Sequence, residues 1–351
     1  MVDYLIVGLG LAGVSFCEKL RENGKSFKVI SDSSQTSSLV AGGLYNPVIL
    51  KRFTLAWKAD EQLQLAKPFY RSLERKLGVQ LDYPLRVFRR FNSIEEQNQW
   101  FEAADKKSIS PFLSTTLHSN KNESIVAPLG YGEVLHAGRI DTRLLIQAYK
   151  NELLKKQLLV QETFRYENLL VEASQVVYKD ISAKRIVFAE GYGIKANPYF
   201  NYLPLNGSKG EYLIIKCQKL NEEKAIKSSL FVIPLGDNLY QVGANYEWKD
   251  KTNSPTLKGG DWVLERLEKI VKCNYEVVGQ MAGVRPTVSD RRPLIGAHPE
   301  KENLFLLNGF GSRGVLIAPF ASAQLFNFIE NGGSLDSEIN INRFDKKWVS
   351  V

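Results

Sequence analysis

The first residues of the chain combine an apolar run with closely spaced glycines, a pattern suited to binding a dinucleotide. Tyr4–Val7 runs directly into Gly8-Leu9-Gly10-Leu11-Ala12-Gly13, a G-x-G-x-x-G sequence. The first glycine permits a tight turn, the second lets backbone approach a pyrophosphate, and the third lets the next helix pack on the strand. The phosphates then face the free N–H groups and the positive end of that helix. The alternative is a tight turn without a ligand.

An acidic residue stands where such a site needs one. Residues 27–30 read as a second strand, and Asp32 follows Gly13 by 19 residues. An acid at that distance can accept hydrogen bonds from an adenosine ribose. Val14, Cys17 and Leu20 give the intervening helix an apolar face. Together these residues predict a dinucleotide-binding strand–helix–strand unit.

Arg285 is the strongest candidate for binding a substrate. Its guanidinium offers a rigid fork of donors that holds a carboxylate in two parallel hydrogen bonds. Pro286 favours an extended backbone for the preceding residue, so the Arg285 side chain can project from a sheet. The alternative is a surface ion pair with Asp290. Arg291 and Arg292 are expected to be only solvated.

A second glycine turn lies near the end of the chain. Gly311-Ser312-Arg313-Gly314 follows an apolar strand at 304–307 and precedes a helix expected over 314–331. The N–H groups at the start of that helix could stabilise a developing negative charge. The alternative is an ordinary strand-to-helix turn. Arg313 either meets a ligand there or packs its stem over the start of the helix.

Tyr246 is a second-tier candidate for the substrate site. It follows an expected strand at 239–243, and its phenol could line a pocket or bond a carboxylate. An ordinary half-buried sheet tyrosine explains it equally well.

The size and composition of the chain fit a folded protein of about two domains. It has 351 residues, of which 44% are hydrophobic and 24% charged. No segment reaches the roughly 20 apolar residues that a membrane span needs, and the short N-terminal run lacks the basic leader of a signal peptide. The net charge of +8 permits a nucleic-acid partner, although solvated lysines also explain it.

The cysteines and histidines argue against a metal site. Cys17, Cys217 and Cys273 lie far apart in the sequence, and none of the three histidines is spaced from another as metal ligands are. Cys17 falls on the expected buried side of the first helix, so we expect a reduced, cytoplasmic protein.

The expected elements suggest an α/β protein of two domains with α+β character. Helices are expected over 54–77, bent at Pro68, over Thr142–Leu158 with Asp141 as N-cap, and over 261–272. Strands separated by turns at 212–216, 230–234 and 239–243 indicate an antiparallel sheet. We therefore expect a discontinuous nucleotide domain over 1–77, 135–200 and 281–351, with a substrate domain formed by 78–134 and 201–280.

Four stretches together resemble the glycine oxidase and D-amino-acid oxidase family of FAD-dependent amine oxidoreductases. They are the N-terminal fingerprint with Asp32, the turn at 204–211, the G-x-R-P…D…P-x-I-G pattern at 283–296, and the G…G-x-x-x-A-P pattern at 309–319. The resemblance implies a Rossmann-like FAD-binding domain with an inserted antiparallel-sheet substrate domain. It also implies non-covalent FAD, and oxidation of the C–N bond of an amino acid or N-substituted glycine. Hydride transfer to flavin N5 would then leave an imine that hydrolyses.

The resemblance also suggests which residues contact the cofactor. Arg285 would bind the substrate carboxylate, with Tyr246 and Arg313 beside it. Gly42 and Gly43 would let backbone lie against the flavin ring, and Ala189 and Gly191 would border the pyrophosphate, although Glu190 replaces the family's usual small residue there. Phe164 would bring its backbone to the adenine, although a core phenylalanine explains it nearly as well. The full expected set is Gly8, Leu9, Gly10, Leu11, Ala12, Gly13, Asp32, Ser38, Gly42, Gly43, Leu44, Phe164, Ala189, Gly191, Gly311, Ser312, Arg313, Gly314 and Val315.

Within that family, residues 309–314 and 243–246 are most similar to the flavin domain of a bifunctional tRNA wobble-uridine modification enzyme. That resemblance implies removal of a carboxymethyl group from a modified uridine, and hence tRNA as a possible partner. No methyltransferase domain is expected within these 351 residues, and the small-residue loop carries Asn46-Pro47. A simple amino-acid oxidase remains equally open. A nicotinamide-dependent dehydrogenase, or a flavin-dependent binding protein without activity, would each explain fewer of the motifs.

Overall fold

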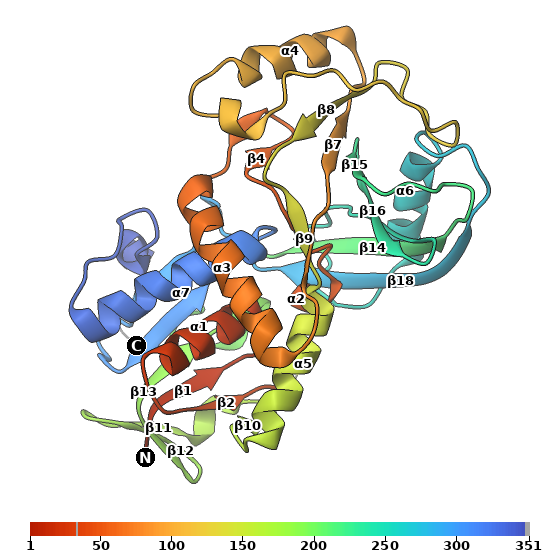
Figure 1. Ribbon diagram of the computed structural model, residues 1–351. Coiled ribbons are helices and arrows are strands. Elements are labelled where there is room, and N and C mark those ends of the chain that lie inside the picture. The colour runs from red at the N-terminus through yellow and green to blue at the C-terminus, as the bar shows by residue number, and fades with distance from the viewer. Residues whose placement is uncertain (33, 348–351) are drawn as a thin grey trace.

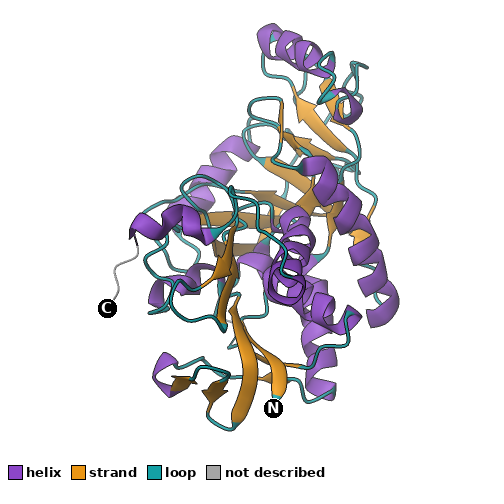
Figure 2. Cartoon of the chain, turned by 90° about the vertical axis from the view of Figure 1, so that its left-hand side faces the viewer, coloured by secondary structure: helices purple, strands orange, loops and turns teal. Residues whose placement is uncertain are grey.

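The computed structural model describes residues 1–32 and 34–347 and contains two large sheets (Figure 1). Residues 348–351, the end of the expected nucleotide domain, lie outside the described residues. The N-terminus lies in the half of the molecule that holds the first sheet, and Figure 2 shows the strands in two groups. Within the described residues, no helix combines the length and apolar character that crossing a membrane requires.

The first sheet has a parallel centre, as the N-terminal unit predicts. Its central strands run β10-β2-β1-β13-β20, all parallel, with Val7 of β1 opposite both Ile30 of β2 and Phe188 of β13. An antiparallel strand and a hairpin complete it. The strands are β1 (Val2–Val7), β2 (Phe27–Ile30), β10 (Leu159–Val160), β11 (Leu169–Val171), β12 (Val176–Tyr178), β13 (Ile181–Phe188), β19 (Leu294–Ala297) and β20 (Leu304–Asn308).

The second sheet is largely antiparallel, and its last strand runs to Arg285, past residue 280, where the substrate domain is expected to end. Its order is β18-β14-β17-β16-β15-β7-β8, and only the β15–β7 pair is parallel within the described residues. Its strands are β7 (Val87–Arg90), β8 (Tyr131–Val134), β14 (Ser208–Lys216), β15 (Ala225–Lys227), β16 (Phe231–Gly236), β17 (Leu239–Gly243) and β18 (Glu276–Arg285). Short strands β3 (Leu44–Tyr45), β6 (Asp82–Tyr83) and β9 (Gly138–Ile140) form a small sheet, and β4 (Val48–Ile49) pairs with β5 (Thr54–Leu55).

Helices α1, α3 and α7 pack against one another over the parallel sheet (Figure 1). The helices are α1 (Leu11–Glu22), α2 (Ser37–Val40), α3 (Ala59–Leu77), α4 (Ile94–Ala104), α5 (Thr142–Lys155), α6 (Leu257–Leu267) and α7 (Gly314–Asn331). Short 3-10 turns are η1 (Ser110–Phe112), η2 (Tyr166–Asn168), η3 (Gly191–Ala196) and η4 (Ile341–Lys347). Buried Phe16 and Cys17 of α1 contribute to the core between these helices, as the apolar face of that helix predicts.

Several expected boundaries are confirmed, and two helices are shifted. Asp141 accepts a hydrogen bond from the Leu144 N–H at 3.0 Å and caps α5, as expected. The expected helix over 54–77 begins only at Ala59, because Thr54–Leu55 pairs with Val48–Ile49. Helix α6 begins earlier than the expected residue 261, because the Thr256 hydroxyl accepts from the Gly259 N–H at 3.0 Å.

A tyrosine from α3 completes the hydrogen bonding of α7. Pro319 lies inside α7 and has no N–H to donate to the Val315 carbonyl one turn before it. The buried Tyr70 hydroxyl donates to that carbonyl at 2.8 Å instead. The start of α7 is therefore fixed against α3 as well as against the sheet.

A short segment containing α2 connects the two sheets. The Thr36 hydroxyl donates to the carbonyl of Ala282 on β18 at 3.0 Å. Gln241 of β17 donates through Nε2 to the Val40 carbonyl at 2.9 Å, and that bond is buried. We refer to residues 36–40 as the bridging segment.

Candidate active site

Three turns meet at the carboxyl edge of the parallel sheet. The turn at 8–13 follows β1, residues 189–191 follow β13, and the turn at 309–314 follows β20. The Ala189 N–H donates to the Val7 carbonyl at 2.7 Å, and Asn308 Nδ2 donates to the Gly191 carbonyl at 2.9 Å. Open parallel sheets bind ligands at this edge. The structure thus brings together the segments that the two glycine patterns singled out.

The glycines of the first turn are required by close backbone contacts. A Cβ atom at Gly8, whose φ is +100°, would lie 2.5 Å from the Ala189 carbonyl oxygen. At Gly13, a Cβ would lie 2.1 Å from the Gly8 carbonyl oxygen. Ser38 covers the start of α1, because its hydroxyl accepts from the Leu11 N–H at 3.2 Å. The turn can therefore hold its N–H groups at the helix start only with these small residues.

The two glycine turns lie side by side, with open space along the edge. A Cβ at Gly314 would lie 3.1 Å from Leu11 Cδ1, so the starts of α1 and α7 are in contact range. At Gly191 and Gly311, a Cβ would meet nothing within 4 Å. Backbone N–H groups at two helix starts, next to unfilled space, fit a pyrophosphate and a flavin ring.

Asp32 is held in the form that accepts hydrogen bonds. Its carboxylate accepts from the Ser34 N–H at 2.8 Å and from the Thr163 hydroxyl at 2.9 Å. Burial alone would raise the pKa of Asp32, but these hydrogen bonds lower it. Thr163 follows β10 and was not anticipated from the sequence.

Glu190 stands where the resembled family usually has a small residue, and its carboxyl group is hydrogen-bonded. Its carboxyl accepts from the Tyr166 hydroxyl at 2.5 Å and from Asn197 Nδ2 at 2.8 Å. Burial raises the pKa of Glu190 to about 7 despite these bonds. The side chain is tied to neighbours on η2 and after η3.

Phe164 lies in the core, whereas the small-residue loop at 42–44 packs closely against other strands. The Phe164 ring is buried and stacks on Tyr178 with centroids 4.3 Å apart, as a core phenylalanine does. Gly42 lies against Ile233 of β16, where a Cβ would be 2.6 Å from Cδ1. A Cβ at Gly43, whose φ is +70°, would lie 1.9 Å from the Ile140 carbonyl oxygen, and Leu44 begins β3. This loop therefore lies against the second sheet and the small β3-β9-β6 sheet.

Arg313 uses its donors on the protein itself. It precedes α7, and its Nη1 and Nη2 donate to the carbonyls of Asn46 at 2.8 Å and Val48 at 3.1 Å. Burial lowers the pKa of Arg313 to about 10, and nearby Tyr246 opposes that shift. Arg313 thus fastens the loop after Gly43 to the start of α7.

Arg285 has the opposite character, because most of its donors are unused. It ends β18, is buried, and donates from Nη1 to the Asn245 carbonyl at 3.3 Å. No other side-chain hydrogen bond of Arg285 occurs within the described part of the chain. Its guanidinium lies 4.6 Å from the Tyr246 ring centroid, and a Cβ at Gly210 would lie 1.9 Å from Nη2. The guanidinium is therefore clamped between an aromatic ring and a bare stretch of backbone.

Two of the expectations for this arginine cluster are corrected. The alternative of an Arg285–Asp290 ion pair is wrong, because the Asp290 carboxylate pairs with Arg343 at 2.9 Å. Arg292 is not merely solvated. It pairs with Glu338 at 2.9 Å and stands 5.4 Å over the Trp57 ring centroid.

The arginine lies next to the second glycine turn. The Gly311 N–H donates to the carbonyl of Pro286 at 3.0 Å, so the residue after Arg285 contacts the turn before α7. Tyr246, which backs Arg285, also acts electrostatically on Arg313. The three candidate catalytic residues are thus gathered at one place.

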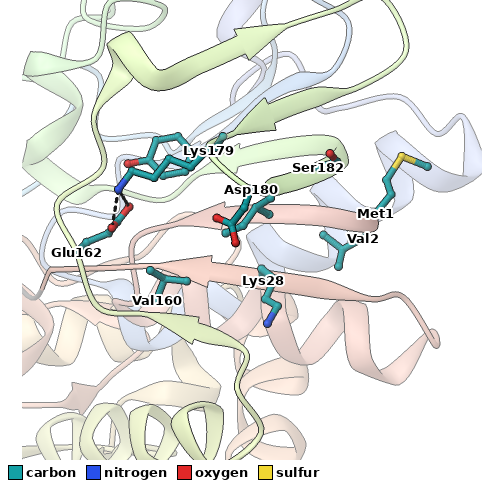
Figure 3. Close-up of a pocket in the computed structure, with 10 residues that line it drawn as sticks. Met1, Val2, Lys28, Val160, Glu162, Lys179, Asp180 and Ser182 are labelled. Atoms are coloured by element: carbon teal, nitrogen blue, oxygen red, sulfur yellow. Dashed lines mark hydrogen bonds and ion pairs between the residues drawn. The ribbon is translucent and has the colours of Figure 1, made fainter.

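A separate hollow of about 380 Å³ lies elsewhere on the parallel sheet (Figure 3). It includes Val2 and Ile181, the first residues of β1 and β13, whereas the glycine turns follow the last residues of these strands. Lys179 pairs with Glu162 beside it at 2.8 Å. This hollow is not part of the candidate site.

Comparison with known proteins identifies the family. Residues 3–326 match the family model described as "DAO: FAD dependent oxidoreductase". The chain belongs to this family. The DAO assignment makes it an FAD-dependent oxidoreductase with a Rossmann-like cofactor fold, and it removes the nicotinamide-dependent alternative. The glycine turns and Asp32 fit that cofactor.

Relatives within the DAO family include glycine oxidases and a tRNA-modifying protein. Glycine oxidase of Bacillus subtilis (strain 168) is 27% identical over 48% of this chain and 47% of that protein. The tRNA 5-methylaminomethyl-2-thiouridine biosynthesis bifunctional protein MnmC of Legionella pneumophila (strain Lens) is 24% identical over 96% of this chain and 54% of that protein. The matches thus span about half the length of these relatives.

Solved structures share the fold. Glycine oxidase from Geobacillus kaustophilus superposes with a TM-score of 0.79 at 18% identity, covering 95% of each chain. Iminodiacetate oxidase from Chelativorans sp. BNC1 superposes with a TM-score of 0.75 at 18% identity, covering 96% of this chain and 99% of that one.

Gly210 and Asn245 were missed by the sequence reasoning. Both touch Arg285, but they lie 75 and 40 positions away from it in the chain. A signal was present, since Lys209 and Glu211 are charged residues at the start of an otherwise apolar strand. Such residues inside a buried strand indicate polar partners.

Proposed function

We propose that this protein oxidises the C–N bond of a small amine that carries a carboxylate, such as an amino acid or N-substituted glycine. The observation that carries this proposal is the clamped Arg285, buried beside the second glycine turn with only one hydrogen bond spent on the protein. Its free donors suit a carboxylate held in two parallel bonds.

Each element of the site has a defined task in this proposal. The turns at 8–13 and 311–314 would hold FAD, with Asp32 at the adenosine ribose. Bound FAD supplies the two-electron oxidation of the substrate. Arg285 would fix the carboxylate and so orient the carbon that is oxidised, and Tyr246 would keep the guanidinium in place. The N–H groups at the start of α7 would stabilise the negative charge that develops during reduction.

The test is anaerobic bleaching of the bound flavin against amino acids and N-substituted glycines. We expect Arg285→Ala to raise the KM for carboxylate substrates about 100-fold, because two charge-assisted hydrogen bonds are lost, while FAD stays bound. Arg285→Lys is the matched control, since it keeps the charge but not the fork, and should recover only part of the loss. Loss of flavin in Arg285→Ala, with no change in KM, would assign the residue a structural role.

A second candidate function is removal of a carboxymethyl group from a modified tRNA wobble uridine. It is supported by the alignment with MnmC over nearly the whole chain, and by Tyr246 and Trp248, which are 61% and 49% exposed near Arg285. Exposed aromatic rings can stack on bases. A gel shift with bulk tRNA that weakens steeply with salt would favour it. No shift at low salt would eliminate it.

We also propose a reducing, cytoplasmic location. Cys17, Cys217 and Cys273 are free thiols, and burial raises the pKa of Cys17 well above its usual range. Fractionation of cells that express the protein would test this.

A further inference from the structure

We propose that Lys209 and Glu211 are positioning residues that set the geometry of the acid-binding arginine through the loop at 244–256. This inference rests on the proposed role of Arg285. Neither residue touches Arg285, but both hold the loop that supplies its carbonyl acceptor and its aromatic partner. We refer to residues 244–256 as the clamp loop.

Lys209 is fully buried, and its three side-chain hydrogen bonds all go to the clamp loop, while the Glu211 carboxylate lies 4.0 Å from its Nζ. Its Nζ donates to Asp250 Oδ2 at 2.5 Å, to Thr252 Oγ1 at 3.3 Å and to the Ser254 carbonyl at 2.5 Å. A buried charge is tolerated only when it is paired and hydrogen-bonded in this way. The ammonium therefore has one favourable arrangement, with the loop folded onto it.

The backbone of Lys209 holds the loop at a second point. Its N–H donates to the Glu247 carbonyl, and the Glu247 N–H donates back to the Lys209 carbonyl, each at 2.9 Å. Glu247 lies between Tyr246 and Trp248 in the chain. This pair of bonds fixes the place from which Tyr246 reaches Arg285.

Glu211 fastens both ends of the clamp loop. Its N–H donates to Asn245 Oδ1 at 2.8 Å, and its buried carboxylate accepts from the Thr256 N–H at 2.7 Å and the Thr256 hydroxyl at 2.8 Å. Gln280 donates to the same carboxylate at 3.1 Å. The Asn245 carbonyl accepts from Arg285, so Glu211 anchors the same residue that the arginine contacts.

One short stretch of β14 serves both sides of the site. Ser208 pairs with Arg285 in the sheet register, and Gly210 lies directly under the guanidinium. Successive residues of a strand point to opposite faces. Residues 208 and 210 therefore belong to the arginine's face, while Lys209 and Glu211 hold the clamp loop from the other.

The experiment measures carboxylate binding to the FAD-loaded protein. Propionate, which has no amine to oxidise, is titrated while the flavin absorbance is followed. We expect Lys209→Met to raise the propionate Kd about tenfold or more, because a displaced clamp loop misplaces the guanidinium. It should also raise the KM for carboxylate amines more than it lowers kcat. Lys249→Met is the matched control, since Lys249 is an exposed lysine of the same loop, and it should leave the propionate Kd unchanged.

A double-mutant cycle separates this inference from the proposed function. In an Arg285→Ala background, Lys209→Met should raise the propionate Kd no further, because its effect acts through Arg285. Additive losses would overturn the positioning role. If Arg285→Ala alone leaves propionate binding unchanged, the proposed function itself fails.

A loop-side variant keeps the test usable if Lys209→Met does not fold. Asp250→Asn removes a charge at a partly exposed position and weakens the same contact. It should raise the propionate Kd several-fold with FAD retained. Unchanged propionate binding in this variant, with the protein folded, overturns the proposal.

Discussion

The two arginines of the candidate site differ in how their donors are used. Arg313 is tied to the carbonyls of Asn46 and Val48, whereas Arg285 gives one bond to Asn245 and keeps its other donors free. The first is part of the edge that would hold the cofactor, and the second is part of the wall that would hold the substrate. A cation that is hydrogen-bonded to two backbone carbonyls stabilises the fold, while one with more spare donors is available to a ligand.

The largest effect should come from replacing Arg313, which is hydrogen-bonded to the protein itself. Arg313→Met leaves two carbonyls without their donor and should lower the free energy of unfolding by about 2–4 kcal/mol. FAD content should fall with it, because the loop after Gly43 is released from the start of α7. Denaturant unfolding and flavin absorbance per protein measure the two effects. If FAD stays bound at full stability and only the substrate KM rises, the contrast between the two arginines is wrong.

A smaller effect is expected from Gly210→Ala, which tests the position of Arg285. Gly210→Ala places a methyl group 1.9 Å from Arg285 Nη2 and should push the guanidinium off its position. We expect the KM for carboxylate amines to rise about tenfold with FAD retained.

Gly279→Ala on neighbouring β18 is the matched control for this substitution. There a Cβ would meet Ile214 at an ordinary 3.8 Å, so kinetics should stay as in the parent protein. Equal effects of the two alanines would show that the sheet, and not the arginine, responds to the added methyl group.

The smallest effect concerns Glu190, a buried carboxyl group beside the first glycine turn, and it is a change in stability with pH. Burial raises its pKa from 4.5 to about 7, so between these values the folded protein binds a proton that the unfolded chain does not. Stability should therefore fall as pH rises from about 4.5 to about 7 and change no further above that. Glu190→Gln should flatten this trend and be more stable at pH 8 by about 1–2 kcal/mol. Unfolding free energies across this range give the comparison, and an unchanged slope in the variant would exclude Glu190 as its source.

The strands, glycine turns and helices of the candidate cofactor edge could be predicted from the sequence because their signals are local. The strand, glycine turn and helix at the N-terminus follow within a few residues, and α7 has the expected bounds of 314 and 331. The substrate wall could be predicted only in part. The substrate role of Arg285 stays a prediction, and its contacts could not be predicted, because Gly210 and Tyr246 come from distant segments and strand register decides which residues meet.

The errors have the same physical origin. A helix starting at residue 54 has good apolar spacing, yet Thr54 and Leu55 gain backbone partners on β4 that no local pattern announces. The Asp290 carboxylate was close in sequence to Arg285, but Arg343 reaches it instead. Tertiary pairing overrides proximity along the chain in both cases.

The bridging segment limits how the molecule can admit its substrate. A movement that separates the two sheets would have to break two hydrogen bonds at once, from Thr36 to Ala282 and from Gln241 to Val40. We expect substrate to enter instead by movement of the exposed Tyr246 and Trp248 side chains, while the backbone of the clamp loop and the two sheets stay in place. Hydrogen exchange should then be slow both at Val40 and at Glu247, whose N–H groups are hydrogen-bonded.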